Sequence, residues 1–255
     1  MSLPLFVLDS VPDIATLVLS GDEGHHAARV QRLTPGARLL ITDGRGLRAR
    51  CVVESVNGGE LNLRVELRDR IPAPQPKLIV VQALPKGDRG ELAVELMTEL
   101  DVDEIVPWSA ARTITQWRGP RGDKALAKWR NAARAAAKQS RRSWFPDVSR
   151  LASTSDVVRR IGDNGGPTFV LHEEADITFF DVASSLLSEH SKMDGAERGA
   201  IMLIVGPEGG LDDREVAQFS EAGAKIVRFG ATVVRTSTAG PAALAALAPW
   251  VGRWR

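Results

Sequence analysis

Three loops of the sequence are polar or rich in glycine and come directly after apolar segments that are typical of β-strands. These strands are expected at residues 168–172, 201–205 and 225–229. Glycine permits positive φ and lets backbone groups approach a ligand closely. One such loop is usually only a tight turn, but three loops at one sheet edge predict a pocket whose N–H and C=O groups bind a ligand such as an adenine ring. The residues expected to line this pocket are Leu171, His172, Glu173, Val205, Gly206, Pro207, Gly209, Gly210, Phe229, Gly230, Val234, Thr236, Ser237 and Ala239.

Charged side chains in these loops limit the chemistry that the pocket can perform. Glu208 in the second loop is either a general base or, as the sequence favours, a structural carboxylate that accepts hydrogen bonds from loop amides. Arg235 in the third loop is expected either to stabilise negative charge on a substrate or to pair with Glu208. We expect His172 to be structural rather than catalytic.

Several common motifs are missing from the sequence. It contains no G-x-G-x-x-G after a strand, no G-x-x-x-x-G-K-[ST] and no G-x-S-x-G, so the standard dinucleotide, P-loop and serine-hydrolase sites are unsupported. The 4 histidines lack metal-ligand spacing, and Cys51 is the single cysteine. We therefore expect no metal and no intrachain disulfide, and a nucleotide-binding oxidoreductase is the weakest alternative.

Alternating strand and helix patterns predict that residues 77–255 form an α/β domain. Short apolar strands in such a pattern imply a mostly parallel sheet that is covered on both faces. Asp212 and Glu215 have the spacing of a helix capping box. Further strands are expected at 78–84 and 104–107, and helices at 88–100, 123–142, 181–188, 212–221 and 238–250.

Residues 1–71 have the pattern of a small β-barrel. Apolar and polar residues alternate over 61–68, which is typical of a half-buried strand, and two further strands are expected at 38–42 and 47–56. A short helix is expected at 24–32. Alternating prolines favour an extended backbone over residues 71–76, so we place the domain boundary in this linker.

Positive charge is concentrated in one segment, although the whole chain has a net charge of only +1. Residues 112–150 contain eleven basic and two acidic side chains, with Trp117, Trp129 and Trp144 among them. Arginine and lysine attract phosphate, and aromatic rings stack on unpaired bases, so this segment is a candidate RNA-binding surface. The alternative is a solvated helix face whose tryptophans lie in the core.

Length and composition exclude several classes of protein. A chain of 255 residues with 44% hydrophobic and 25% charged residues fits one or two folded domains. No apolar run reaches the roughly 18 residues that a membrane helix needs, and the N-terminus lacks the basic start of a signal peptide. We expect a cytoplasmic protein that has no membrane partner.

Two loop motifs make the sequence similar to a known family. The segments G-P-E-G-G-L at 206–211 and V-V-R-T-S-T-A at 233–239 resemble the RsmE family of SPOUT methyltransferases, the ribosomal RNA (uridine-N3)-methyltransferases that act on 16S RNA. His25-His26 and Asp43-Gly44 resemble the family's N-terminal PUA-like barrel. The similarity runs in order along nearly the whole chain and includes residues 86–89, 98–107 and 129–142.

The resemblance implies a fold and an activity. The fold would be a PUA-like β-barrel followed by a SPOUT-type knotted α/β domain with a parallel sheet, and the protein would be a homodimer. S-adenosylmethionine would be the methyl donor, with no metal, and the substrate would be one uridine of 16S ribosomal RNA in the assembled small subunit. Direct transfer to N3 requires a uracil anion, which a cation such as Arg235 or Arg142 would stabilise, with Glu208 as the weaker candidate for a general base.

The remaining implications concern RNA binding and the points at which this sequence differs from the family. Many relatives carry an acidic residue where Ser237 stands, and an arginine where residues 3–5 are Leu-Pro-Leu. The residues expected to bind RNA are His26, Arg29, Arg32, Lys86, Arg112, Arg130, Arg134, Lys138 and Arg141.

Two alternatives stay open at this stage. One is a SPOUT ribose 2′-O-methyltransferase that acts on tRNA or on large-subunit RNA, which mapping of the methyl group would distinguish. The other is a non-catalytic RNA-binding assembly factor, which would not bind S-adenosylmethionine.

Overall fold

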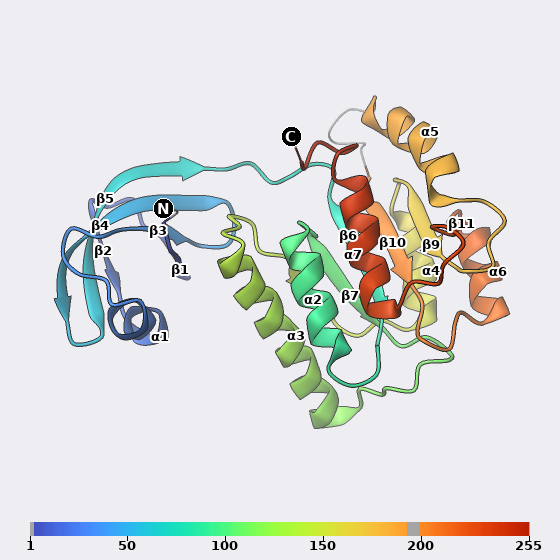
Figure 1. Ribbon diagram of the computed structural model, residues 1–255, viewed down its shortest axis with the longest axis horizontal. Helices are drawn as coiled ribbons and strands as arrows, with labels where there is room; N and C mark the ends of the chain where they lie inside the picture. Colours follow the sequence, from blue (N-terminus) through green and yellow to red (C-terminus); the bar gives the residue numbers. More distant parts are fainter. Residues whose placement is uncertain (1–2, 193–198, 255) are drawn as a thin grey trace. The chain divides into compact units, whose positions relative to one another are not determined.

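The computed structural model describes residues 3–192 and 199–254, which form two compact units (Figure 1). One unit contains Met1–Ala73 together with Ala137–Phe145, and the other contains Pro74–Ala136 and Pro146–Arg255. The chain leaves the first unit and enters the second at residues 73–74, which lie in the segment where the sequence predicts a linker. The segment 137–145, which we expected within the second domain, packs instead with the first unit.

The first unit is built on a five-stranded sheet in the order β1-β3-β4-β5-β2. Its core consists of inward-facing apolar side chains such as Leu39, Ile41, Leu61 and Leu63. The strands β1 and β2 are short and were not predicted. The bounds are β1 Leu5–Val7, β2 Thr16–Leu19, β3 Arg38–Thr42, β4 Leu47–Asn57 and β5 Glu60–Arg70.

The helix predicted at residues 24–32 differs from the observed one in its bounds and its type. An α-helix, α1 (Gly21–His25), continues into one π-helical turn, η1 (His26–Val30). Gly24 is buried where a Cβ would lie 2.4 Å from the carbonyl oxygen of Gly59. The helix therefore packs directly on the backbone of β2 at Leu19 and of the turn at Gly59, and only glycine fits at this position.

The segment 137–145 is attached to the first unit by backbone hydrogen bonds. The Gly46 N–H donates to the Ser143 carbonyl at 2.8 Å, and the Phe145 N–H donates to the Gly44 carbonyl at 2.9 Å. The indole N–H of Trp144 donates to the Ile71 carbonyl at 2.9 Å. Trp144 thus serves the packing of this unit, rather than presenting a free ring for base stacking.

The second unit confirms the expected α/β class, with a six-stranded sheet in the order β11-β9-β10-β6-β7-β8. Every neighbouring pair of these strands is parallel. Strand β8 was not predicted. The bounds are β6 Leu78–Ala83, β7 Glu104–Trp108, β8 Asp147–Val148, β9 Thr168–Leu171, β10 Ile201–Val205 and β11 Lys225–Val227.

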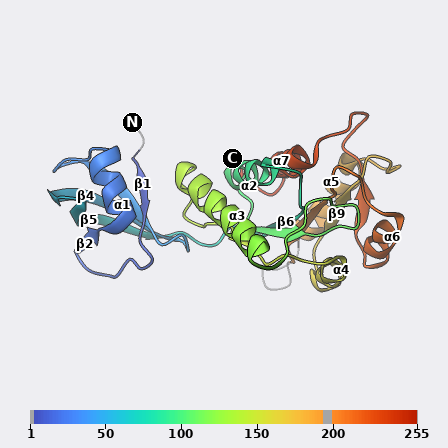
Figure 2. The same cartoon turned by 90° about the horizontal axis from the view of Figure 1, so that it is seen from below.

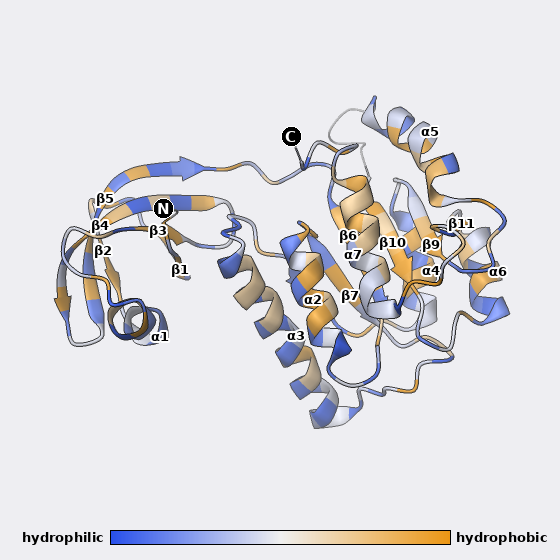
Figure 3. Cartoon of the chain, viewed as in Figure 1, coloured by the Kyte–Doolittle hydropathy of each residue, from blue (hydrophilic) through white to orange (hydrophobic). Residues whose placement is uncertain are grey.

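Helices cover both faces of this sheet (Figure 2). The face that contains Val80 and Leu203 packs on α2, α3, α5 and α7, and the face that contains Val81 and Ile204 packs on α4 and α6. The strands are buried on both faces, which explains why β6 and β10 are strongly apolar (Figure 3). The bounds are α2 Arg89–Glu99, α3 Gly119–Gln139, α4 Thr154–Asp163, α5 Phe179–Ser191, α6 Asp213–Glu221 and α7 Thr236–Leu247.

Most helix predictions are confirmed within a few residues, and two details differ. Helix α3 spans 119–139 instead of 123–142, and α4 was missed although Ser153 and Asp156 form a capping box at its start. The capping box predicted for Asp212 and Glu215 is present. None of the described helices is both long and apolar enough to span a bilayer. The trefoil knot stays a prediction.

Candidate active site

The sheet register brings the predicted loops together at one edge. Leu171 at the end of β9 lies beside Val205 at the end of β10 and beside Val227 at the end of β11. Val205 in turn pairs with Gln82 of β6. Because these strands are parallel, the loops that follow them leave the sheet at the same edge, where ligands bind in open α/β folds.

The three loops line a cavity of about 250 Å³ at this edge. The glycine-rich loop after β10, the segment after β9 and the loop between β11 and α7 all contribute to its wall. The residues predicted to bind a ligand that do line it are Leu171, His172, Glu173, Val205, Gly206, Pro207, Gly210, Phe229, Gly230, Val234, Thr236 and Ala239. Gly209 and Ser237 are predicted residues that lie outside this lining, whereas Leu211, Arg228, Thr232 and Val233 belong to it and were missed.

Glycine keeps side chains out of the cavity at the points where the backbone turns. Gly210 has φ of +72°, and a Cβ there would lie 3.4 Å from a carboxylate oxygen of Glu173. A Cβ at Gly230 would meet no atom within 4 Å, so this backbone faces open space. The cavity wall therefore exposes peptide groups, which suits a ligand that carries a polar heterocycle.

Glu208 connects two loops of the site through its side chain. Its carboxylate accepts a hydrogen bond from the Lys86 N–H at 3.1 Å, which joins the loop after β6 to the loop after β10. This contact is the structural role that the sequence favoured for Glu208. The residue also lines the cavity, so its role as a base stays a prediction.

Arg235 is the cation best placed to act on a ligand. It is the N-cap residue of α7, lines the cavity and is exposed. Its carbonyl accepts the Thr238 and Ala239 N–H groups at 2.8 and 2.9 Å, which begins the helix. Within residues 3–192 and 199–254, no ion pair holds its guanidinium, and none joins it to Glu208. Its positive charge is therefore available to a substrate.

Two further side chains support the loops. The ring Nδ1 of His172 accepts a hydrogen bond from the Glu174 N–H at 3.1 Å, which is the structural role expected for this histidine. Arg228, which the sequence did not single out, donates to the Ala175 carbonyl at 3.1 Å. Arg228 directly precedes Phe229 and Gly230 of a predicted ligand loop, and this position in the sequence could have identified it as a cavity residue.

Comparison with known proteins identifies the family to which this fold and site belong. A family model for RNA methyltransferase domains matches residues 72–248, and a model for RNA methyltransferase PUA domains matches residues 19–66. The ribosomal RNA small subunit methyltransferases E of Mycobacterium bovis and Mycobacterium tuberculosis are each 45% identical over 254 residues, which cover 98% of this chain and 93% of the relative. The chain belongs to this methyltransferase family.

A solved structure of a family member has the same fold. The ribosomal RNA small subunit methyltransferase E of Neisseria gonorrhoeae, bound to S-adenosyl methionine, is 25% identical to this chain with a TM-score of 0.81. The match covers 97% of this chain and 98% of the other. The expected resemblance is thus confirmed, together with the PUA-like first domain.

The third catalytic candidate of this methyltransferase, Arg142, lies in a different unit from the residues that line the cavity. It belongs to the segment 137–145 of the first unit, is 9% exposed and donates from Nε to the Trp144 carbonyl at 2.9 Å. It is absent from the described lining of the cavity. These contacts favour a structural role, and its catalytic role stays a prediction without support from this structure.

The candidate RNA-binding residues differ in their exposure and in their partners within the protein. Lys138 pairs with Glu23 at 2.5 Å, and Arg130 donates from Nε to the Val148 carbonyl at 3.1 Å. His26 lies 3.4 Å from the side-chain nitrogen of Gln31. The exposed members are Arg29, Arg32, Lys86, Arg112, Arg130, Arg134 and Arg141. Of these, Arg112 also pairs with Asp212 at 3.8 Å.

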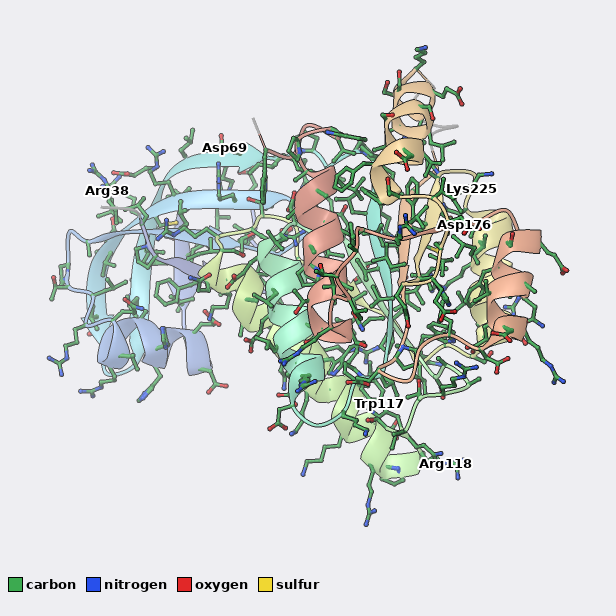
Figure 4. All side chains as sticks on the ribbon, turned by 45° about the vertical axis from the view of Figure 1, so that its right-hand side comes forward. Arg38, Asp69, Trp117, Arg118, Asp176 and Lys225 are labelled. Atoms are coloured by element: carbon green, nitrogen blue, oxygen red, sulfur yellow. The ribbon has the colours of Figure 1, made fainter. Side chains whose placement is uncertain are left out.

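The tryptophans of the basic segment do not form a stacking surface. Trp129 is 4% exposed and belongs to the core of the second unit. Trp117 packs edge to face on it with ring centres 5.0 Å apart, just before the start of α3 (Figure 4). The alternative interpretation of this segment, a charged helix face with buried tryptophans, is therefore confirmed for these two rings.

Proposed function

We propose that this protein transfers a methyl group from S-adenosylmethionine to N3 of one uridine in 16S ribosomal RNA of the assembled small subunit. The observation that carries the proposal is the cavity at the carboxyl edge of the sheet, lined by the loops that follow β9, β10 and β11. Its chain belongs to a family in which a member binds this donor. We place the activity in the cytoplasm and include no metal in it.

The peptide groups of the three loops are the groups that would hold the donor. Gly206, Gly210 and Gly230 keep side chains away from this wall, and the carboxylate of Glu173 beside Gly210 favours a cationic ligand. S-adenosylmethionine supplies an electrophilic sulfonium methyl group. The loops align this methyl group with the acceptor nitrogen, and alignment of the reacting atoms lowers the barrier substantially.

Arg235 is proposed to stabilise negative charge on the target base. Uracil N3 is a poor nucleophile until its proton leaves, so a fixed cation beside the base favours the reactive anion. The guanidinium of Arg235 is exposed at the cavity and borders the first turn of α7. Glu208, already held by the Lys86 N–H, is the weaker candidate for accepting the proton.

The protein is proposed to form a homodimer, in which a second copy of the chain covers an exposed aromatic patch. The rings of Phe180 and Trp250 are 48% and 45% exposed and lie 6.5 Å apart. Phe229, which lines the cavity, lies 6.5 Å from Phe180, so this aromatic patch is continuous with the site. Burial of exposed aromatic rings in an interface is strongly favourable.

The proposal is tested with purified protein, radiolabelled S-adenosylmethionine and small ribosomal subunits that lack the modification. We expect one methyl group per subunit, located at N3 of a single uridine by mass spectrometry of nuclease fragments. Free large subunits and tRNA serve as control substrates. Label on a ribose 2′-oxygen would contradict the proposed specificity, and no binding of the donor in calorimetry would contradict the enzyme activity.

A further inference from the structure

Glu215 in α6 is a buried carboxylate whose contacts exceed what its helix requires. It is 4% exposed, and one oxygen accepts the Asp212 N–H at 3.2 Å, which completes the capping box. The other oxygen accepts the Ala111 N–H and the Thr154 hydroxyl, each at 2.8 Å. Glu215 thus joins three segments: the start of α6, the start of α4 and the loop after β7.

Two other capping boxes within the described residues, at α4 and α5, show what a cap alone needs. Helices α4 and α5 use Asp156 and Asp181 at the same position, and each carboxylate reaches back to its own N-cap N–H at 3.0 Å. Both of these hydrogen bonds lie at the surface. A glutamate that is buried and extends to Ala111 is therefore not explained by helix capping.

The loop held by Glu215 carries Arg112 directly onto the glycine-rich loop of the cavity. A Cβ at Gly209 would lie 3.3 Å from both the Cβ and the carbonyl oxygen of Arg112. The Arg112 guanidinium lies 3.4 Å from the Gly209 carbonyl and 3.8 Å from the Asp212 carboxylate. Its side chain is 48% exposed, so N–H groups of the guanidinium that are not used by Gly209 and Asp212 can reach a ligand.

We propose that Glu215 is a positioning residue that fixes Arg112 beside Gly210 at the cavity, where the guanidinium binds a phosphate next to the target nucleotide. The carboxylate acts through the Ala111 N–H, because that hydrogen bond fixes the backbone directly before Arg112 and so fixes the position of Arg112 on the glycine-rich loop. This inference rests on the proposed function, since it names the group that places the RNA relative to the methyl donor.

Two substitutions separate positioning from capping. Glu215→Asp keeps a carboxylate for the cap, as in α4 and α5, but is too short to reach Ala111. Glu215→Gln keeps one oxygen that can reach Ala111 and Thr154, but it places an amide nitrogen, which is a donor, opposite the Asp212 N–H. Glu221→Asp, on an exposed residue near the end of α6, is the matched control. Arg112→Ala removes the guanidinium itself.

The readouts are binding of a fluorescent 16S RNA fragment or small subunit at several salt concentrations, donor binding by calorimetry, and Tm. We expect Glu215→Asp and Arg112→Ala each to weaken RNA binding about tenfold, the loss of one charge-assisted contact. Each should also reduce the salt slope by about 0.7 to 0.9. Donor affinity should stay within about twofold. Glu215→Gln should lower Tm and retain RNA affinity.

The double variant Arg112→Ala with Glu215→Asp decides the inference. If Glu215 acts through Arg112, the double variant binds RNA no more weakly than Arg112→Ala alone. Additive losses, or equal losses of donor and RNA affinity, would overturn the inference and leave the proposed function intact. A wild-type protein that binds RNA but transfers no methyl group would contradict the proposed function, while this binding cycle would still test Glu215.

Discussion

One buried glutamate lies where the strands of the six-stranded sheet begin, at the amino edge, and another lies where they end, at the carboxyl edge. The two carboxylates have different kinds of partner. At the amino edge, Glu104 begins β7 and accepts bonds from Lys77 at 2.6 Å, Arg160 at 2.9 Å and the Ser149 hydroxyl at 2.6 Å. At the carboxyl edge, Glu215 accepts hydrogen bonds from the Ala111 and Asp212 N–H groups and from the Thr154 hydroxyl, which are all neutral donors.

This difference separates stability from function along one sheet. At the amino edge, two partly exposed cations pair with one buried carboxylate. The carboxyl edge satisfies Glu215 with uncharged donors, and the exposed Arg235 lines the cavity. Arg112 pairs with Asp212 at 3.8 Å but keeps a side chain that is 48% exposed beside the glycine-rich loop. Removal of a charge should therefore lower the activity when the residue lies at the carboxyl edge and the stability when it lies at the amino edge.

The largest effect is expected for Arg235→Ala at the carboxyl edge. Loss of a group that stabilises charge in the transition state costs about 10² to 10³ in kcat. Donor affinity should change only a few-fold, and Tm should stay near that of the wild type because no described ion pair is lost. Single-turnover methylation of small subunits, calorimetry and thermal unfolding measure the three quantities.

The control for this variant is Arg214→Ala, which removes an exposed arginine from the first turn of α6. Its methylation rate should equal that of the wild type. If Arg235→Ala instead loses donor affinity in the same proportion as the rate, Arg235 serves donor binding and the proposed role on uracil is wrong.

The second effect is on stability and is expected for Glu104→Ala at the amino edge. Removal of one partner from a buried ion pair costs about 3 to 5 kcal/mol, and we expect the lower end because Lys77 and Arg160 are partly exposed. Denaturant unfolding measures this change. The methylation rate well below the Tm should be unchanged, and a large loss of kcat would contradict the division between the two edges.

The third prediction concerns the pH dependence of the same carboxylate. Burial acts to raise the pKa of Glu104, but hydrogen bonds from Lys77 and Ser149 and the charges of Lys77 and Arg160 outweigh it and hold the pKa below its usual range. A lowered folded-state pKa means that the stabilisation is complete above the unfolded-state value, about 4.3, and is lost as the pH falls through the folded-state pKa.

The measurement is the unfolding free energy of the wild type and of Glu104→Gln between pH 3 and pH 7. The difference should be constant near neutral pH and should shrink at acidic pH. A difference that grows as the pH falls would show that the carboxylate is protonated in the folded protein at neutral pH, contrary to its assigned partners.

Local patterns in the sequence were sufficient to locate the cavity. Apolar strands such as 201–205 and the glycines that follow them mark the strand ends, and a parallel sheet places those ends at one edge. The capping spacing of Asp212 and Glu215 was also readable, because it depends on residues within one turn. These features are short in range, so one sequence reveals them.

Long-range pairing is what the sequence did not reveal. Nothing near Trp144 indicates that its indole binds the Ile71 carbonyl, and this pairing moves residues 137–145 into the first unit together with Arg142. The reach of Glu215 to Ala111 spans 104 positions and is equally invisible locally. Helix α4, by contrast, has a capping box at Ser153 and Asp156, whose spacing depends on residues within one turn and is readable from the sequence.

The smallest expected effect tests whether the same distinction between engaged and available cations holds along α3. Arg134 is exposed, whereas Lys138, one turn further on, pairs with Glu23 and is only 24% exposed in its side chain. Each phosphate contact contributes about 0.7 to 0.9 to the slope of log affinity against log salt concentration. Arg134→Ala should therefore reduce this slope by up to about 0.9 in binding to small subunits, whereas Lys138→Ala should leave the slope unchanged. An equal reduction in both variants would show that Lys138 exchanges Glu23 for phosphate when RNA binds, so that an ion pair in the free protein does not exclude a cation from the RNA surface.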